Sequence, residues 1–246
     1  MMLPYDIFNH FIDHADFNTL INLCYVDKKI RQMCLQRPFT KVLLQFKFNE
    51  FYNPEVKSEV LDSFLNNISG NDEVFLREIQ LIFGSFLSHN ILNKIVCLSG
   101  WCNGRTTFLS LLRKILGDLY RHIPGKIVRI DYIKHAKVLY IDESELCEET
   151  IPILKRLLGK DNIQTTYNID YNIVITDHVK FNEKLGDRAQ ILKFKTRYVP
   201  NAIYNNDIGC KIMDRHLTDR LRNDRDVLSA FLTFLLIGCR DMLNKL

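Results

Sequence analysis

The sequence has few glycines and prolines, no low-complexity tract and no internal repeat. Among 246 residues there are 10 glycines and 6 prolines. This composition excludes disordered, collagen-like and solenoid proteins. The hydrophobic share of 47% and the charged share of 25% are those of an ordinary globular protein with a sizeable core.

Features of secreted and membrane proteins are also missing. The seven cysteines are an odd number and form no CxxC pair, so reduced thiols are expected. The first twenty residues carry several acidic side chains instead of the apolar run of a signal peptide. The most apolar stretch, 227–237, is too short to cross a bilayer, so no membrane association is expected. These features predict an intracellular protein. The net charge of +4 permits a nucleic-acid partner without arguing for one.

Short β-branched runs alternate with helical patterns in the middle of the chain. Helical spacing of apolar residues marks 1–39, 53–88 and the last forty residues. The alternation between them predicts an α/β fold with a largely parallel sheet, flanked by helical N-terminal and C-terminal segments. The expected strands are 94–98, 137–141, 172–175 and 191–194, and the expected helices between them are 106–120 and 151–158.

This pattern divides the chain into four expected parts. They are a small helical segment at 1–46, a helical lead-in at 50–92, an α/β core at 93–200 and a C-terminal helical part at 201–246.

The strand at 94–98 runs into a loop that is similar to the Walker A motif G-x-x-x-x-G-K-[ST]. Such a loop points backbone N–H groups at phosphate oxygens, at the N-terminus of a helix. Gly104 takes the place of the second glycine, Arg105 that of the lysine, and Thr106 offers a hydroxyl to Mg²⁺. Ser99 stands where the first glycine is expected, so it should adopt that glycine's backbone conformation. The alternative is an ordinary strand–turn–helix with a polar turn.

The strand at 137–141 ends in Asp142 and Glu143, which is the Walker B pattern. Asp142 would hold Mg²⁺ through water, and Glu143 would orient or deprotonate the attacking water. The alternative is a strand that simply runs into an acidic loop.

Two later residues are candidates for contacts with the outer phosphate. Asp177 follows the apolar strand at 172–175, where such enzymes place a sensor residue. Arg188 precedes the strand at 191–194 and would serve as an arginine finger for a neighbouring subunit's nucleotide. A solvated surface arginine is the alternative for Arg188.

In this order, the motifs resemble the superfamily 3 helicase domain of poxvirus-type viral primase-helicases, which are AAA+-like P-loop ATPases. The resemblance covers about 51–246. The run Asn103-Gly104-Arg105-Thr106-Thr107-Phe108 is similar to the family's Asn-Gly-Lys-Ser-Thr-Phe. Segments 75–87, 154–161 and 227–238 resemble its lead-in helix, the segment after Walker B and its C-terminal helix.

The resemblance implies a homo-hexameric ring that hydrolyses ATP with Mg²⁺ and moves along single-stranded DNA during viral replication, in the host cytoplasm or nucleus. It implies Asp142, Glu143 and Arg188 as catalytic residues, and Thr106 and Asp142 as metal ligands. The implied nucleotide-binding residues are Ser99, Asn103, Gly104, Arg105, Thr106, Thr107 and Asp177.

Three of these positions depart from the family pattern. Ser99 replaces glycine, Arg105 replaces lysine, and Asp177 stands in place of an asparagine. A guanidinium is larger and forked compared with an ammonium, and an acidic group near the γ-phosphate would repel it. An active helicase ATPase and a degenerate, slow or inactive one therefore both remain open.

The first forty residues loosely resemble an F-box, through 3–7 and 20–30. An F-box docks a Skp-type adaptor of ubiquitin ligases through an apolar helical face. The alternative is a small helical cap that packs on the ATPase domain. The rival function is accordingly a non-catalytic interaction protein that keeps the NTPase fold as a scaffold and binds its partner through residues 1–40.

Overall fold

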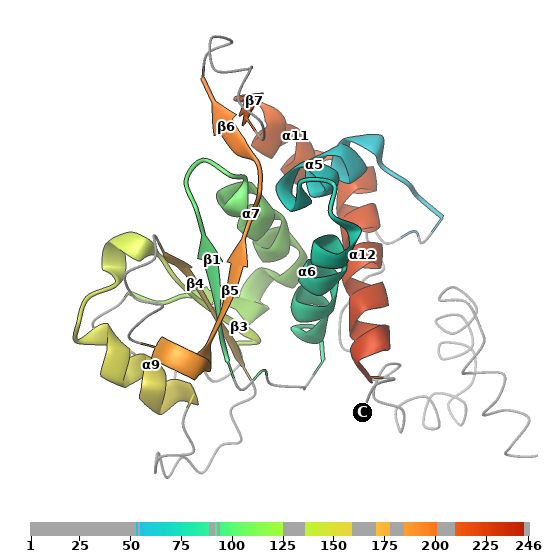
Figure 1. Cartoon of the computed structure of the whole chain (residues 1–246). Coiled ribbons are helices and arrows are strands. Elements are labelled where there is room, and N and C mark those ends of the chain that lie inside the picture. The colour runs from blue at the N-terminus through green and yellow to red at the C-terminus, as the bar shows by residue number, and fades with distance from the viewer. Residues whose placement is uncertain are drawn as a thin grey trace, which may run out of the picture.

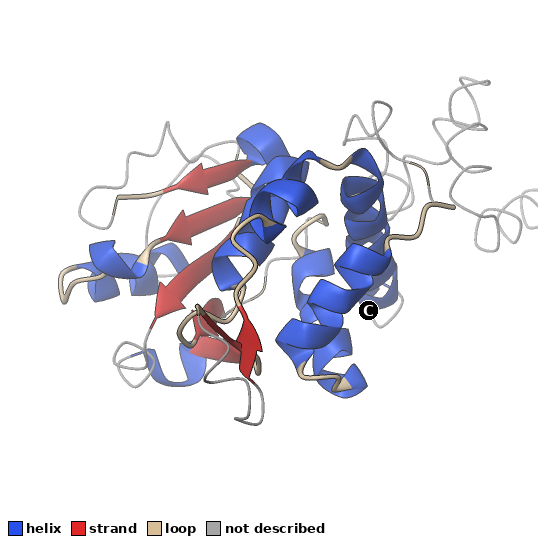
Figure 2. Cartoon of the chain, turned by 90° about the horizontal axis from the view of Figure 1, so that it is seen from above, coloured by secondary structure: helices blue, strands red, loops and turns tan. Residues whose placement is uncertain are grey.

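The computed structural model of the chain describes residues 53, 55–88, 92, 94–124, 136–158, 171–177, 185–200 and 210–243. Within these ranges, a parallel sheet lies between helical layers (Figures 1 and 2). The helices are α5 (Glu59–Ser69), α6 (Glu73–Ser85), α7 (Arg105–Leu116), α9 (Thr150–Leu158), α11 (Leu217–Asn223) and α12 (Arg225–Leu243), with short 3-10 turns η2 (Gly117–Leu119), η3 (Glu143–Glu145) and η4 (Gly186–Arg188). The strands are β1 (Ile95–Ser99), β2 (Tyr120–His122), β3 (Val138–Ile141), β4 (Asn172–Asp177), β5 (Ala189–Lys193), β6 (Arg197–Val199) and β7 (Cys210–Ile212).

The main sheet has five parallel strands in the order β2-β3-β4-β1-β5. β1 lies between β4 and β5, and β4 separates it from β3. Ser99 pairs with Asp177 across β1 and β4, and Ile141 pairs with Ile175 across β3 and β4. The ends of β1, β3 and β4 therefore meet at one edge of the sheet, which is where ligands bind in open α/β sheets.

β1, β3 and β4 are largely buried on both faces, which explains why they appear in the sequence as continuous apolar runs. Val96 and Leu98 point into the core shared with α5, α6, α7 and α12, whereas Ile95 and Cys97 point into a second core beneath α9. The larger core centres on Phe108 of α7. Its ring makes edge-to-face contacts with Phe83, Phe194 and Phe231, the nearest at a centroid distance of 4.6 Å. Such contacts add to the hydrophobic stabilisation from burying the rings.

α6 and α12 lie side by side, although about 150 residues separate them (Figure 1). A glycine on each helix allows this approach. A β-carbon added to Gly84 would lie 2.6 Å from the carbonyl oxygen of Leu235, and one added to Gly238 would lie 2.6 Å from the carbonyl carbon of Gln80. The N-terminal lead-in helices and the C-terminal helix thus form one helical layer.

The ends of the lead-in helices follow from their sequence. The Ser58 hydroxyl caps α5 by accepting from the Leu61 N–H at 3.3 Å. Gly70, at φ +67°, ends α5 in the left-handed conformation that glycine adopts most readily. The Asp72 carboxylate then caps α6 by accepting from the Phe75 N–H at 3.0 Å.

The predicted α/β class is confirmed, with its mostly parallel sheet and flanking helices. The helix expected at 106–120 is wrong at its end, because α7 stops at Leu116. Gly117, at φ +53°, turns the chain there, and Tyr120 begins β2, which the sequence did not predict. The last forty residues are also not wholly helical, since β7 pairs with β6 in a small parallel sheet. The expected boundary at residue 200 runs between these two strands.

Other expectations can be checked only in part. The helices and F-box-like segment expected at 1–46 lie outside the described residues. The five cysteines of the described residues form no disulfide with one another. The described part of the chain contains no helix that is both long and apolar enough to cross a bilayer.

Candidate functional site

The loop between β1 and α7 follows an interior strand of the sheet, because β1 lies between β4 and β5. Its left-handed conformations belong to Gly100 (φ +114°), Cys102 (φ +47°) and Gly104 (φ +88°). Ser99 is the last residue of β1 and is buried without a positive φ. Ser99 therefore needs no left-handed conformation, because Gly100 makes the turn one residue later.

The side chain of Asn103 crosses this loop. It is 3% exposed, and its Nδ2 donates to the Ser99 carbonyl oxygen at 2.8 Å. A β-carbon on Gly100 would lie 2.5 Å from that nitrogen, so only glycine leaves room for the crossing side chain. The Asn103 Oδ1 atom is also buried, and it has no hydrogen-bond partner among the described residues. Asn103 therefore sets the shape of the loop from inside.

The N-terminus of α7 is open to an anion. Gly104 occupies the cap position, so no side chain accepts from the first N–H groups of the helix. Glycine is also required there by packing, because a β-carbon would lie 3.0 Å from Ile68 and 3.1 Å from Phe64. The loop is thereby pressed against α5, with its helix N-terminus facing the sheet edge.

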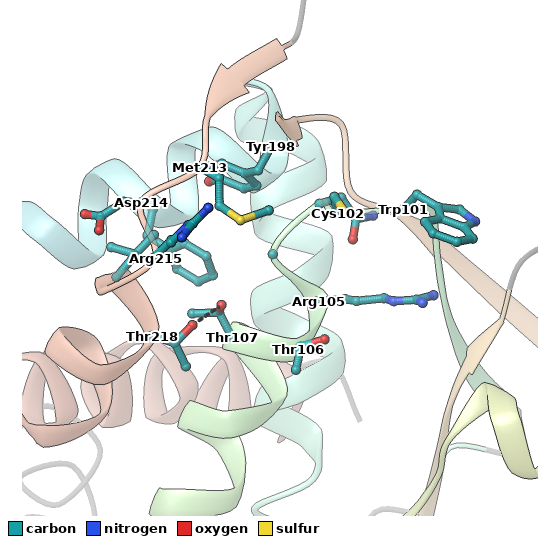
Figure 3. Close-up of a pocket in the computed structure, with 14 residues that line it drawn as sticks. Trp101, Cys102, Arg105, Thr106, Thr107, Tyr198, Met213, Asp214, Arg215 and Thr218 are labelled. Atoms are coloured by element: carbon teal, nitrogen blue, oxygen red, sulfur yellow. Dashed lines mark hydrogen bonds between the residues drawn. The ribbon is translucent and has the colours of Figure 1, made fainter. Parts of the chain in front are cut away.

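The side chains of Arg105 and Thr107, at the start of α7, point in different directions. The Arg105 Nη1 atom donates to the Leu98 carbonyl oxygen at 3.4 Å, a long hydrogen bond. Figure 3 shows the Arg105 side chain extending away from Thr107 and toward the side of the loop that carries Trp101. The Thr107 hydroxyl instead forms a 2.8 Å hydrogen bond with Thr218 of α11 (Figure 3). Thr107 thus ties α7 to α11.

Asp142 lies just after β3, at the same edge of the sheet. Its Oδ2 accepts from the Tyr140 hydroxyl at 2.7 Å, and its Oδ1 accepts from the backbone N–H and the hydroxyl of Ser144 at 3.1 and 2.7 Å. Burial raises the pKa of Asp142, but these hydrogen bonds outweigh burial and hold the pKa below its usual range. The carboxylate is therefore ionised at neutral pH, as a metal ligand must be.

Thr106 of α7 and Tyr140 of β3 line the same pocket. Thr106 and Tyr140 both line a pocket of about 860 Å³, together with His122 and Arg113. A hydroxyl and a carboxylate from neighbouring elements are oxygen ligands of the kind that Mg²⁺ takes from proteins. Asp142 is not among the residues that line this pocket, so a magnesium site held by Thr106 and Asp142 stays a prediction.

The remaining predicted residues, Glu143, Asp177 and Arg188, do not all lie at the carboxyl ends of the strands. The Asp177 backbone lies in register with Ser99, beside the start of the loop. The structure does not describe the side chains of Asp177 and Glu143. Arg188 is exposed in η4, at the opposite edge, because Ala189 pairs with Ile95 at the start of β1. A five-residue strand spans about 15 Å, so Arg188 does not reach the loop of its own chain.

A second pocket, of about 510 Å³, lies on the other side of the loop (Figure 3). Its walls come from the loop and α7, from Phe64 of α5, and from the β6–β7–α11 region that contributes Tyr198, Met213 and Arg215. The backbone N–H of Tyr198 donates to the Cys102 carbonyl oxygen at 2.6 Å, which attaches β6 to the loop. Figure 3 shows Met213 and Arg215 above Thr107 and Thr218.

Sequence reasoning missed Tyr198, Met213 and Arg215. Nothing near them in the sequence has a recognisable motif, and their neighbours in the pocket are about 100 residues away along the chain. The weak signal available was the apolar Ile212-Met213 pair between charged residues.

Comparison with solved structures gives matches at the level of the fold. No family model and no curated protein matches the sequence. The C-terminal region of NrS-1 in its apo A form matches with a TM-score of 0.50 at 10% identity, over 76% of this chain and 50% of that one. A second structure of the same region, residues 305–718, matches with a TM-score of 0.51 at 11% identity, over 76% and 49%.

The chain therefore spans about half the length of the NrS-1 region, at 50% coverage. The JCV helicase also matches, at 14% identity over 85% of this chain and 63% of that one, but its TM-score of 0.40 is too low to support a conclusion. At these identities, the similarity establishes the α/β fold that the chain shares with the NrS-1 C-terminal region.

Proposed function

We propose that this chain is a superfamily 3 helicase-like protein that binds Mg²⁺-ATP at the loop between β1 and α7. The observation that carries the proposal is the geometry of that loop. Gly100 and Gly104 adopt left-handed conformations, and α7 begins without a side-chain cap. An uncapped helix N-terminus after a tight glycine loop at a sheet edge is an anion site suited to phosphate.

Several of the predicted residues have a role in this proposal. The N–H groups at the start of α7 bind phosphate oxygens, and Arg105 neutralises their charge from the β3 side. Thr106 and Asp142 hold the magnesium ion, which supplies charge neutralisation when bound. Glu143 orients or deprotonates the attacking water, as the resemblance implies.

The pocket beside Tyr198 and Met213 suits the nucleoside end of the ligand. Its volume of about 510 Å³ lies in the usual range for small-molecule sites. Phe64, Tyr198 and Met213 provide apolar and aromatic surface against which a base ring packs. Arg215 lines the same pocket and adds a positive charge near the loop.

Impaired hydrolysis is part of the proposal. The forked guanidinium of Arg105 cannot replace a compact ammonium without moving the phosphates. Because Arg188 lies at the opposite edge of the sheet, it can act only on nucleotide bound by a neighbouring subunit, so turnover also requires a ring. A homo-hexamer on single-stranded DNA, within viral replication, is the setting that the resemblance supplies.

The test is Mg²⁺-ATP binding to the full chain by calorimetry, with the fluorescence of Trp101 as a second signal. Trp101 is the chain's one tryptophan and is 68% exposed within the loop. We expect saturable binding that Asp142→Ala weakens about tenfold or more. Asp118→Ala is the matched control, because Asp118 is a carboxylate with a side chain 96% exposed. It should leave binding unchanged.

Absence of binding by the wild-type protein would contradict the proposal. Binding restored by Arg105→Lys would then identify a retired ATPase. In that case the rival function, a scaffold that recruits a Skp-type adaptor or another partner through residues 1–40, becomes the one to pursue.

A further inference from the structure

Tyr140 is the third residue of β3, near the end of the strand. It lies two residues before Asp142, and side chains two apart on a strand point to the same face of the sheet. Its hydroxyl donates to the Asp142 Oδ2 atom at 2.7 Å and lies 3.3 Å from the Thr176 Oγ1 atom on β4. A phenol therefore stands between the ends of two neighbouring strands and bonds directly to the candidate metal ligand.

Tyr140 completes a set of three donors around one carboxylate. The other two, the N–H and hydroxyl of Ser144, both use Oδ1. Each carboxylate oxygen has two lone pairs, so Oδ1 is fully used and Oδ2 keeps one lone pair. The carboxylate is thus fixed in orientation, with a single acceptor position left for a ligand.

The ring of Tyr140 is held in place by other aromatic rings. Tyr120 and His122 of β2 pack beside it at centroid distances of 5.9 and 5.4 Å. The Tyr140 hydroxyl is the donor in the hydrogen bond to Asp142. Phenylalanine would preserve this packing and remove only the hydroxyl.

We propose that Tyr140 is a positioning residue, which orients the Asp142 carboxylate toward hydrated Mg²⁺ at the sheet edge. The proposal rests on the proposed function, because it concerns the same metal site. Hydrogen bonds to a metal-ligating carboxylate fix its direction, and their removal typically costs 10–100-fold in metal affinity. The link to Thr176 extends the hydrogen bonds to β4, the strand that ends beside the phosphate loop.

The experiment uses the full chain with Tyr140→Phe, and titrates Mg²⁺ at fixed ATP while following Trp101 fluorescence and calorimetric heat. The same nucleotide titration is repeated in EDTA. We expect Tyr140→Phe to need about tenfold more Mg²⁺ for half-maximal binding. Its metal-free ATP affinity and its Tm should change little, because the ring packing is kept.

Ser144→Ala is a second variant with little risk of misfolding, since Ser144 is exposed. It removes one donor from Oδ1 but leaves the backbone N–H in place, so it should shift the Mg²⁺ requirement in the same direction by a smaller factor. Such a graded series would support positioning by hydrogen bonds.

Three results are distinguishable. An unchanged Mg²⁺ requirement in Tyr140→Phe overturns the role of Tyr140. Equal loss of affinity with and without Mg²⁺, together with a lower Tm, also overturns it and makes Tyr140 a structural residue. Absence of nucleotide binding by the wild-type protein at every Mg²⁺ concentration overturns the proposed function, and the inference about Tyr140 with it.

Discussion

Replacing Gly238 by alanine should destabilise the protein, although alanine is the better helix former. Gly238 lies in α12 where this helix crosses α6. The added β-carbon would lie 2.6 Å from the carbonyl carbon of Gln80 and nearer still to its oxygen. These are backbone atoms of a packed helix, so a side-chain rotation cannot relieve the overlap.

The magnitude follows from two opposing effects. Carbon atoms in contact lie about 3.5–4.0 Å apart, so the helices would have to separate by about 1 Å. Overpacking of this kind costs about 1–3 kcal/mol, and a backbone clash places it near the upper end. The higher helix propensity of alanine offsets about 1 kcal/mol. The expected loss is therefore about 2 kcal/mol, which corresponds to a Tm lower by about 4–8 °C for a chain of this length.

Thermal unfolding followed by circular dichroism measures this loss. Gly84→Ala should act similarly, because it obstructs the same crossing from the other helix. Val74→Ala on α6 is the control, since Val74 is 81% exposed and should change stability by less than about 0.5 kcal/mol. A Gly238→Ala protein as stable as wild type, or stabilised by the propensity gain, would refute the close helix crossing.

Three further predictions concern the site. Asn103→Ala removes the hydrogen bond across the loop and should weaken ATP binding about fivefold, the equivalent of about 1 kcal/mol. Equal ATP affinity by calorimetry would show that Asn103 does not shape the loop for binding. Thr107→Val breaks the bond to Thr218, so Tm should fall by about 2–4 °C with ATP affinity retained, whereas a large loss of affinity at constant Tm would favour a direct phosphate contact. Because the pKa of Asp142 is depressed in the folded protein, its stabilisation is present above the ordinary carboxyl pKa of about 4 and is lost as the pH falls through the folded pKa. The Tm difference between wild type and Asp142→Asn should therefore shrink below about pH 4, and a constant difference would contradict this linkage.

The parts of the fold that the sequence predicted are those whose environment imposes a pattern. β1, β3 and β4 of the parallel sheet are largely buried on both faces, so each appears as an apolar run, whereas β5 at the end of the strand order is partly exposed. Gly104 and Asp142 were predicted from short local motifs, a glycine-containing loop after one strand and an acidic pair after another. Their meeting at one sheet edge follows from the parallel topology, which was also predictable.

The parts that could not be predicted depend on contacts distant in the sequence. β2 has three residues, and its pairing with β3 decides its conformation rather than its own propensity. The pocket beside the loop includes Tyr198 and Met213, which backbone hydrogen bonds to Cys102 and Val199 hold in place. Tyr140 could have been read as an ordinary strand tyrosine, since its bond to Asp142 depends on the orientation of both side chains.

The three residues that differ from the Walker A and sensor pattern have different structural consequences. Ser99 imposes no backbone cost, because β1 continues through it and Gly100 provides the turn. The Asp177 backbone is in register with Ser99, at the end of β1 where the loop begins. Arg105 is the departure that alters the cation itself, and its guanidinium already reaches back to the Leu98 carbonyl. A ligand phosphate must compete with that contact for a group that presents its donors in a rigid fork. Arg105→Lys is therefore the substitution that tests whether this position limits the proposed ATP hydrolysis.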